Sequence, residues 1–97
     1  MKCCNNIEFL GCFDSCKEQI ETKLEADESG IWTIEIDFMG ISQKQTMTID
    51  ETELPKKINI ANNFNEDYEY IMRIYKPEGT LFNNTCYSFK IYKAVCN

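Results

Sequence analysis

Polar and apolar residues alternate regularly in the segment that follows Gly30. Apolar side chains occupy every second position and polar ones lie between them: Trp32, Ile34, Ile36 and Phe38 against Thr33, Glu35 and Asp37. This period of two predicts a strand with one buried face and one face in water. The alternation resumes after Gly40 and runs to Ile49, so the two segments predict a hairpin that turns around Met39 to Ile41.

Three later segments also predict strands. The stretch Lys57 to Ala61 is short, and its two isoleucines share a face. Tyr68 to Tyr75 carries apolar residues on both faces, which is typical of a central strand. Cys86 to Val95 predicts the last strand, with one apolar face made of Tyr87, Phe89, Ile91 and Val95.

The segment Glu18 to Ala26 fits two patterns, because Ile20 and Leu24 are spaced as on a helix while residues 20–26 also alternate. Only a short connection, Asp27 to Gly30, separates it from the strand at Trp32. We therefore expect a strand that pairs with that neighbour. Phe64 lies among turn-forming residues, and we expect its side chain to be buried beneath that loop. Lys76 to Gly79 predicts a tight turn.

Together these segments predict an all-β fold, a small immunoglobulin-like β-sandwich of six or seven antiparallel strands. A buried Trp32 suits that packing. The 97 residues fit a single domain, 1–97, in which residues 1–17 form a cysteine-rich N-terminal segment.

Composition and charge exclude several functions. The chain has ten Lys and Arg residues against sixteen Asp and Glu, a net charge of −6, which is the wrong sign for holding nucleic acid. It contains no histidine, so the commonest general base and the usual triads are missing. We expect no enzymatic activity.

Neither a signal peptide nor a long apolar run is found in the sequence. The expected place of synthesis is a cytoplasm, with no membrane partner.

Six cysteines allow three interpretations. They are Cys3, Cys4, Cys12, Cys16, Cys86 and Cys96. They could form disulfides in an oxidising environment, or the N-terminal four could hold zinc, although only Cys12 and Cys16 have the spacing of a zinc knuckle. Small buried thiols in a reducing cell are the favoured interpretation, with no cofactor.

Two sets of side chains are candidates for a functional surface. Glu35 and Asp37 lie two residues apart on one strand face, where a carboxylate pair can bind a cation or do acid–base work. Without a nucleophile or histidine beside them, a solvated face is favoured. Ile71, Tyr75 and Tyr92 could form an exposed apolar surface for a protein or sugar partner, or a second core face.

Several short motifs, taken together, resemble small virion proteins of crAss-like and related tailed phages of gut Bacteroidetes. The motifs are Cys3-Cys4, Gly11 to Cys16, Ala26 to Thr33, Phe64 to Tyr68, Lys76 to Phe82 and Cys86-Tyr87. The resemblance implies a non-enzymatic auxiliary or decoration protein of a capsid or fibre. Its partners would be other virion proteins, such as the major capsid protein or fibre proteins, and its location the virion.

The acidic, histidine-free composition and the Tyr-rich strands also suit a structural subunit of a larger assembly, which could form a homo-oligomer. Two alternatives stay open: a zinc-binding small domain built on the N-terminal cysteines, and a carbohydrate-binding or adhesion module that uses the Tyr surface.

Overall fold

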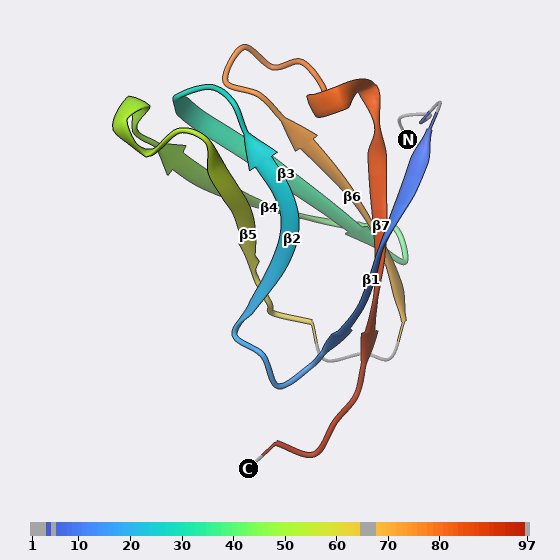
Figure 1. Ribbon diagram of the computed structural model, residues 1–97. Helices are drawn as coiled ribbons and strands as arrows, with labels where there is room; N and C mark the ends of the chain where they lie inside the picture. The colour runs from blue at the N-terminus through green and yellow to red at the C-terminus, as the bar shows by residue number, and fades with distance from the viewer. Residues whose placement is uncertain (1–3, 5, 65–67, 97) are drawn as a thin grey trace.

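The computed structural model describes residues 4, 6–64 and 68–96. Two sheets are formed, with strand orders β1-β7-β6-β3-β4 and β2-β5 (Figure 1). The elements are β1 (Ile7–Asp14), β2 (Gln19–Ala26), β3 (Gly30–Phe38), β4 (Ile41–Ile49), η1 (Glu51–Glu53), β5 (Lys56–Ala61), β6 (Glu69–Tyr75), η2 (Phe82–Asn84) and β7 (Cys86–Tyr92). The all-β fold, expected with six or seven strands, is confirmed, and the described residues form seven. None of the helices in the described ranges is long and apolar enough to cross a membrane.

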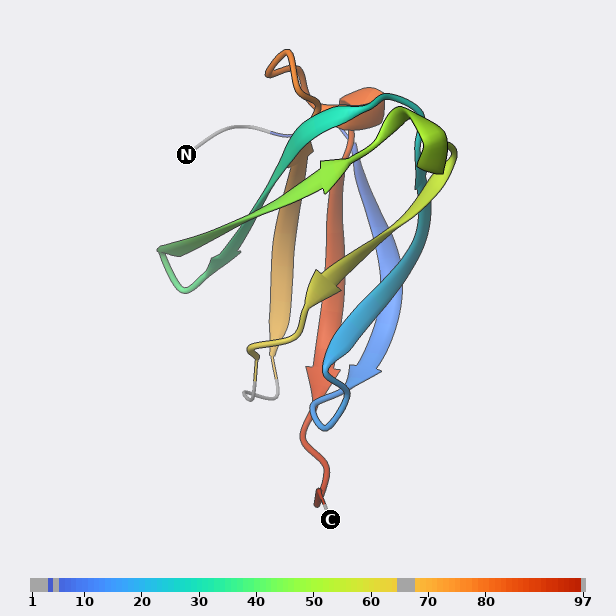
Figure 2. The same ribbon diagram turned by 90° about the vertical axis from the view of Figure 1, so that its left-hand side faces the viewer.

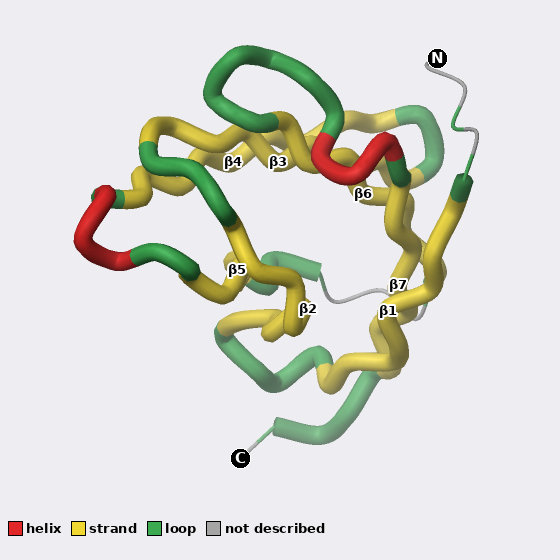
Figure 3. Tube along the Cα trace, turned by 45° about the horizontal axis from the view of Figure 1, so that its top comes forward, coloured by secondary structure: helices red, strands yellow, loops and turns green. Residues whose placement is uncertain are grey.

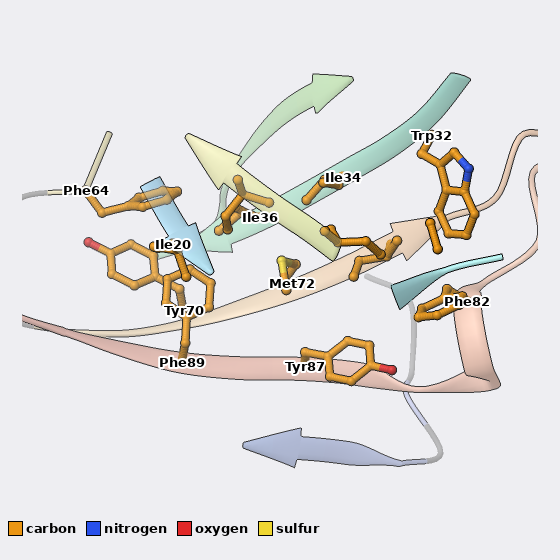
Figure 4. Packing of buried hydrophobic residues seen from close by; sticks show 14 of the residues in the cluster. Ile20, Trp32, Ile34, Ile36, Phe64, Tyr70, Met72, Phe82, Tyr87 and Phe89 are labelled. Atoms are coloured by element: carbon orange, nitrogen blue, oxygen red, sulfur yellow. The ribbon is translucent and has the colours of Figure 1, made fainter. Parts of the chain in front are cut away.

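The two sheets enclose one hydrophobic core, with the larger sheet curving around β2 and β5 (Figure 3). Alternation along the strands supplies the core from both sides. Trp32, Met72 and Phe89 come from the larger sheet, and Ile20 and Ile60 come from the smaller one. Figure 4 shows several of these side chains converging between the layers.

Three expectations are confirmed: the hairpin around Met39 to Ile41, the central position of the strand after Tyr68, and the burial of Phe64. Strands β3 and β4 pair in an unbroken antiparallel register around Met39 and Gly40, whose φ angles of 50° and 80° give the twist that a two-residue hairpin turn requires. Figure 2 shows this hairpin extending away from β6. β6 is the middle strand of the larger sheet. Phe64 is buried against the rings of Tyr70 and Phe89.

The expected pairing of residues 18–26 with the Trp32 strand is wrong. The segment is a strand, β2, but it pairs antiparallel with β5 in the other sheet. The connection between β2 and β3 leads the chain from the smaller sheet to the larger one. Within it, the Glu28 carbonyl accepts a hydrogen bond from the Trp32 Nε1–H at 3.0 Å. Ile20 and Trp32 therefore face the core from opposite layers, which alternation alone also allows.

The expectation that all strands are antiparallel is also wrong. β1 lies within the cysteine-rich segment and pairs in parallel with β7, at the edge of the larger sheet. The last strand ends at Tyr92, so Val95 does not join its apolar face and is 94% exposed.

Candidate functional site

Two disulfides clamp β1 to β7 at both ends of their parallel pairing. Cys4 precedes β1 and is bonded to Cys86, the first residue of β7, with Cα atoms 5.8 Å apart. Cys16 follows β1 and is bonded to Cys96 beyond the end of β7, with Cα atoms 5.4 Å apart. An edge strand that would otherwise depend on one row of hydrogen bonds is thus held covalently.

Free, buried thiols were the favoured interpretation of the cysteines, and this is wrong for the four that form disulfides. Cys12 is free but exposed, and Cys3 lies outside the described residues. In the part of the chain that the structure describes, no group of three or more His, Cys, Asp or Glu side chains could hold a metal ion. Zinc therefore gains no support.

An apolar strip on the outer face of the larger sheet extends from the clamped strand β1 to β6. Phe9 of β1, Ser88 of β7 and Ile71 of β6 are neighbours in one row across the sheet. Ser88 is only 4% exposed, because it is small and lies between the two larger side chains. Ile7 lies in the next row beside Cys86. Ile7 and Phe9 are 58% and 52% exposed, whereas Ile71 is half-buried, and we call these three residues the apolar strip.

The three residues predicted as a binding surface share this outer face, but they do not form one cluster. Ile71 belongs to the apolar strip. Tyr75 and Tyr92 lie eight residues apart along the strands, since Met72 pairs with Tyr87 in an antiparallel register. At the usual rise of a strand that is about 26 Å. Their predicted binding role stays a prediction, and it now refers to separate parts of the face.

A cluster of ionised side chains lies at the centre of the same face. Arg73 of β6 donates from Nε and Nη2 to Glu35 Oε1, at 2.9 and 2.7 Å, and from Nη2 to Asp37. Lys44 of β4 lies 3.8 Å from the other Glu35 oxygen. The carboxylates were expected to be solvated, but the Glu35 side chain is only 16% exposed, so that expectation is wrong for it.

The pKa values of the cluster follow from these contacts. The hydrogen bonds from Arg73 hold the pKa of Glu35 below its ordinary value, against the opposing effect of burial. Burial alone would lower the pKa of Arg73, but the hydrogen bonds to Glu35 and Asp37 outweigh it and raise that pKa. The charges of Glu35 and Arg73 therefore stabilise each other, and we call Arg73, Glu35 and Asp37 the ionised clamp.

Arg73 was missed at the sequence level. The available signal was a cation at an outward position between two core residues, Met72 and Ile74. Its meaning depends on register, because only the pairing of Arg73 with Glu35 brings the charges together. That pairing joins strands nearly 40 residues apart in sequence.

A cavity of about 310 Å³ opens beside the ionised clamp, between β3, β4 and the turn after β6. Its lining includes Thr33, Glu35, Lys44, Tyr75 and Pro77. The turn is fixed against β3 because Pro77 packs on Gly30, where an added Cβ would lie 2.8 Å from the Pro77 Cγ. Gly30 has a φ of 127°, which a residue with a side chain rarely adopts.

The outer face carries nearly balanced charge, although the whole chain has a net charge of −6. By the strand registers, its ionisable side chains are three basic and four acidic: Lys44, Arg73 and Lys90, and Asp14, Glu35, Asp37 and Glu69. Most of the excess negative charge therefore lies elsewhere. A balanced face with an exposed apolar strip can bind a protein without strong electrostatic repulsion.

Comparison with protein-family models, curated proteins and solved structures finds no match to this chain. Its function must be inferred from its own residues.

Proposed function

We propose that the chain is a non-enzymatic, immunoglobulin-like interaction domain, and that it serves as an auxiliary or decoration protein on the capsid or a fibre of a phage particle. The observation that carries the interaction role is the apolar strip, whose two most exposed members lie on the disulfide-clamped strand β1. Ile7 and Phe9 are more than half exposed, and large apolar side chains grouped on one face are typical of protein interfaces.

The immunoglobulin-like assignment is supported by strand order. The neighbours β7-β6-β3-β4 correspond to strands G, F, C and C′ of a variable-type domain, and β2-β5 corresponds to the pair B and E. Trp32 on the strand equivalent to C is fully buried, as in that fold. The disulfides differ from the bridge between strands B and F of antibody domains, because they join the flanks of β1 and β7.

The virion assignment is supported by the resemblance of the sequence motifs and by the disulfides. Disulfides persist on the outside of cells and particles, whereas a cytoplasm keeps thiols reduced. In this proposal the chain is made in the host cytoplasm with free thiols. After lysis, dissolved oxygen oxidises each cysteine pair, which loses two electrons and two protons and locks β1 in place.

The interaction role predicts a partner among the virion proteins, such as the major capsid protein or a fibre protein. The partner would cover Phe9 and Ile71 with its own apolar side chains. Phe9 is the residue whose truncation should cost most, because an aromatic side chain supplies the largest contact area in the strip.

The test is reconstitution on particles of the parent phage that lack this chain. Purified wild-type protein should co-sediment with them, and Phe9→Ser should lower its affinity at least about tenfold. Val95→Ser is the matched control, because Val95 is 94% exposed and follows the end of β7, seven residues after Ser88, the β7 partner of Phe9. Failure of the wild-type protein to bind, or an equal loss in both variants, would overturn the proposal.

A further inference from the structure

The cavity beside Tyr75 has rigid walls. On one side, the turn after β6 is closed by two backbone hydrogen bonds: the Gly79 N–H donates to the Lys76 carbonyl at 2.8 Å, and the Lys76 N–H donates to the Thr80 carbonyl at 2.9 Å. The Lys76 ammonium contacts Glu28 at 2.9 Å, which ties the turn to the segment before β3. With Pro77 packed on Gly30, this wall is fixed before any ligand arrives.

The side chain of Tyr75 also lines the cavity, and it is bonded to the ionised clamp. A hydrogen bond between Tyr75 and Arg73 helps to raise the pKa of Arg73, and Arg73 is held in turn by Glu35 and Asp37. Burying a guanidinium in this way adds little net stability to a fold. It does fix the direction of the groups bonded to it, which is what a binding site requires of its supporting residues.

The lining combines apolar surfaces with both kinds of hydrogen-bonding group. Tyr75, Pro77 and Ile31 supply apolar walls, whereas Thr33, Glu35 and Lys44 supply a hydroxyl, a carboxylate and an ammonium group. The charges of Glu35 and Asp37 are paired with those of Arg73 and Lys44, and the ammonium of the lining residue Lys76 is paired with Glu28 and Asp27. A site whose charges are already paired does not favour an anion such as phosphate or a simple cation. It suits a neutral ligand that has an apolar face and many hydroxyls.

We propose that this cavity binds one pyranose ring of a glycan. The apolar face of the sugar lies against the Tyr75 ring, and its hydroxyls donate to Glu35 and accept from Lys44 and Thr33. The volume of about 310 Å³ lies at the small end of ligand sites, which fits one ring rather than a long oligosaccharide. The site is separate from the apolar strip, so the domain could attach to a particle by one part of its outer face and hold a glycan with another.

The proposal is tested by NMR titration of the oxidised protein with glucose, galactose, mannose and N-acetylglucosamine, each up to about 50 mM, because a single ring in an open site binds with millimolar affinity. At least one sugar should shift the backbone amide signals of Thr33, Glu35, Tyr75 and Gly79. Lys44→Met should weaken that binding several-fold without affecting the fold, since the Lys44 side chain is 67% exposed. Tyr75→Leu should abolish it.

Tyr92→Leu is the matched control, because Tyr92 lies at the far end of the same face, and it should leave sugar binding unchanged. The proposal is overturned if no sugar shifts the cavity signals, if Tyr92→Leu and Lys44→Met lower binding equally, or if inorganic phosphate shifts those signals more strongly than every sugar. Phe9→Ser should leave sugar binding intact, so failure here is distinguishable from failure of the proposed attachment role.

Discussion

Arg73 donates two hydrogen bonds to a single oxygen of Glu35, from Nε at 2.9 Å and from Nη2 at 2.7 Å. The two residues are direct partners across β6 and β3, on a sheet face that is turned toward solvent. The Arg73 side chain is nevertheless only 8% exposed. Its charge is therefore neutralised by protein groups more than by water, and the negative charges of Glu35 and Asp37 are in turn compensated by Arg73.

Removing Arg73 should destabilise the domain strongly. Arg73→Ala leaves Glu35 and Asp37 close together without their cation, and we expect the free energy of unfolding to fall by about 3 kcal/mol. Lys44→Ala removes a mostly exposed cation from the same Glu35 and should cost less than about 0.5 kcal/mol. Urea denaturation of both variants measures the difference, and equal losses would show that the clamp contributes nothing beyond a surface ion pair.

The ionised clamp also makes the stability of the fold depend on pH. The pKa of Glu35 is lower in the folded chain than its ordinary value of about 4.3, so its ionised form favours folding. This contribution is fully present above the ordinary value and is lost as pH falls through the folded pKa. Thermal melting between about pH 6 and pH 2 should show a smaller acid-induced drop in Tm for Glu35→Gln than for the wild type. Identical pH profiles would contradict this role of Glu35.

The disulfides should each contribute substantially to stability. Taken alone, each bond closes a loop of about 80 residues. When one bond is already present, the second closes only a smaller ring, which consists of the N-terminal and C-terminal segments between the two bonds. Replacing Cys16 and Cys96 by serine should lower the free energy of unfolding by about 3 kcal/mol, and replacing all four bonded cysteines should cost more than twice that. Guanidinium denaturation without reductant measures both effects. Cys12→Ser is the control, because that thiol is free, and it should change little.

The contact between Gly30 and Pro77 gives a further test. In Gly30→Ala the new methyl group meets Pro77, and the residue also has to keep a φ of 127°, so we expect a loss of about 2 kcal/mol. Gly40→Ala is the comparison, because Gly40 also has a positive φ but nothing lies within 4 Å of an added Cβ. A Gly30→Ala variant no less stable than Gly40→Ala would show that the turn is not packed against β3.

Strands with a clean period of two were predictable from local sequence. The segment around Trp32 and the strand after Tyr68 could be recognised because their core residues recur at every second position. β1 escaped detection for a physical reason: a register shift between Phe9 and Gly11 interrupts its alternation, and its apolar residues Ile7 and Phe9 are exposed. Its partner β7 lies almost at the other end of the chain, and local patterns carry no information about such a pairing.

The candidate site was predictable only in part. Alternation places Ile71 and Tyr75 on one face of β6, and the strand register brings Tyr92 of β7 to the same face of the sheet. Alternation does not fix register, so it could not tell that Tyr75 and Tyr92 lie far apart or that Arg73 meets Glu35. The pairing of Cys4 with Cys86 depends on the same long-range register, and cysteine spacing alone allows many pairings.

The most direct test of the account is disulfide mapping of the chain extracted without reductant from purified phage particles, after free thiols have been alkylated. Cleavage after Glu8 and Asp14 is needed to separate Cys4, Cys12 and Cys16, and trypsin separates the two C-terminal cysteines. We predict that the chain is found in the particles, with Cys4 linked to Cys86, Cys16 linked to Cys96, and Cys12 alkylated. Absence of the chain from the particles, or six alkylated cysteines in it, would contradict a virion protein whose interaction strand is locked by disulfides.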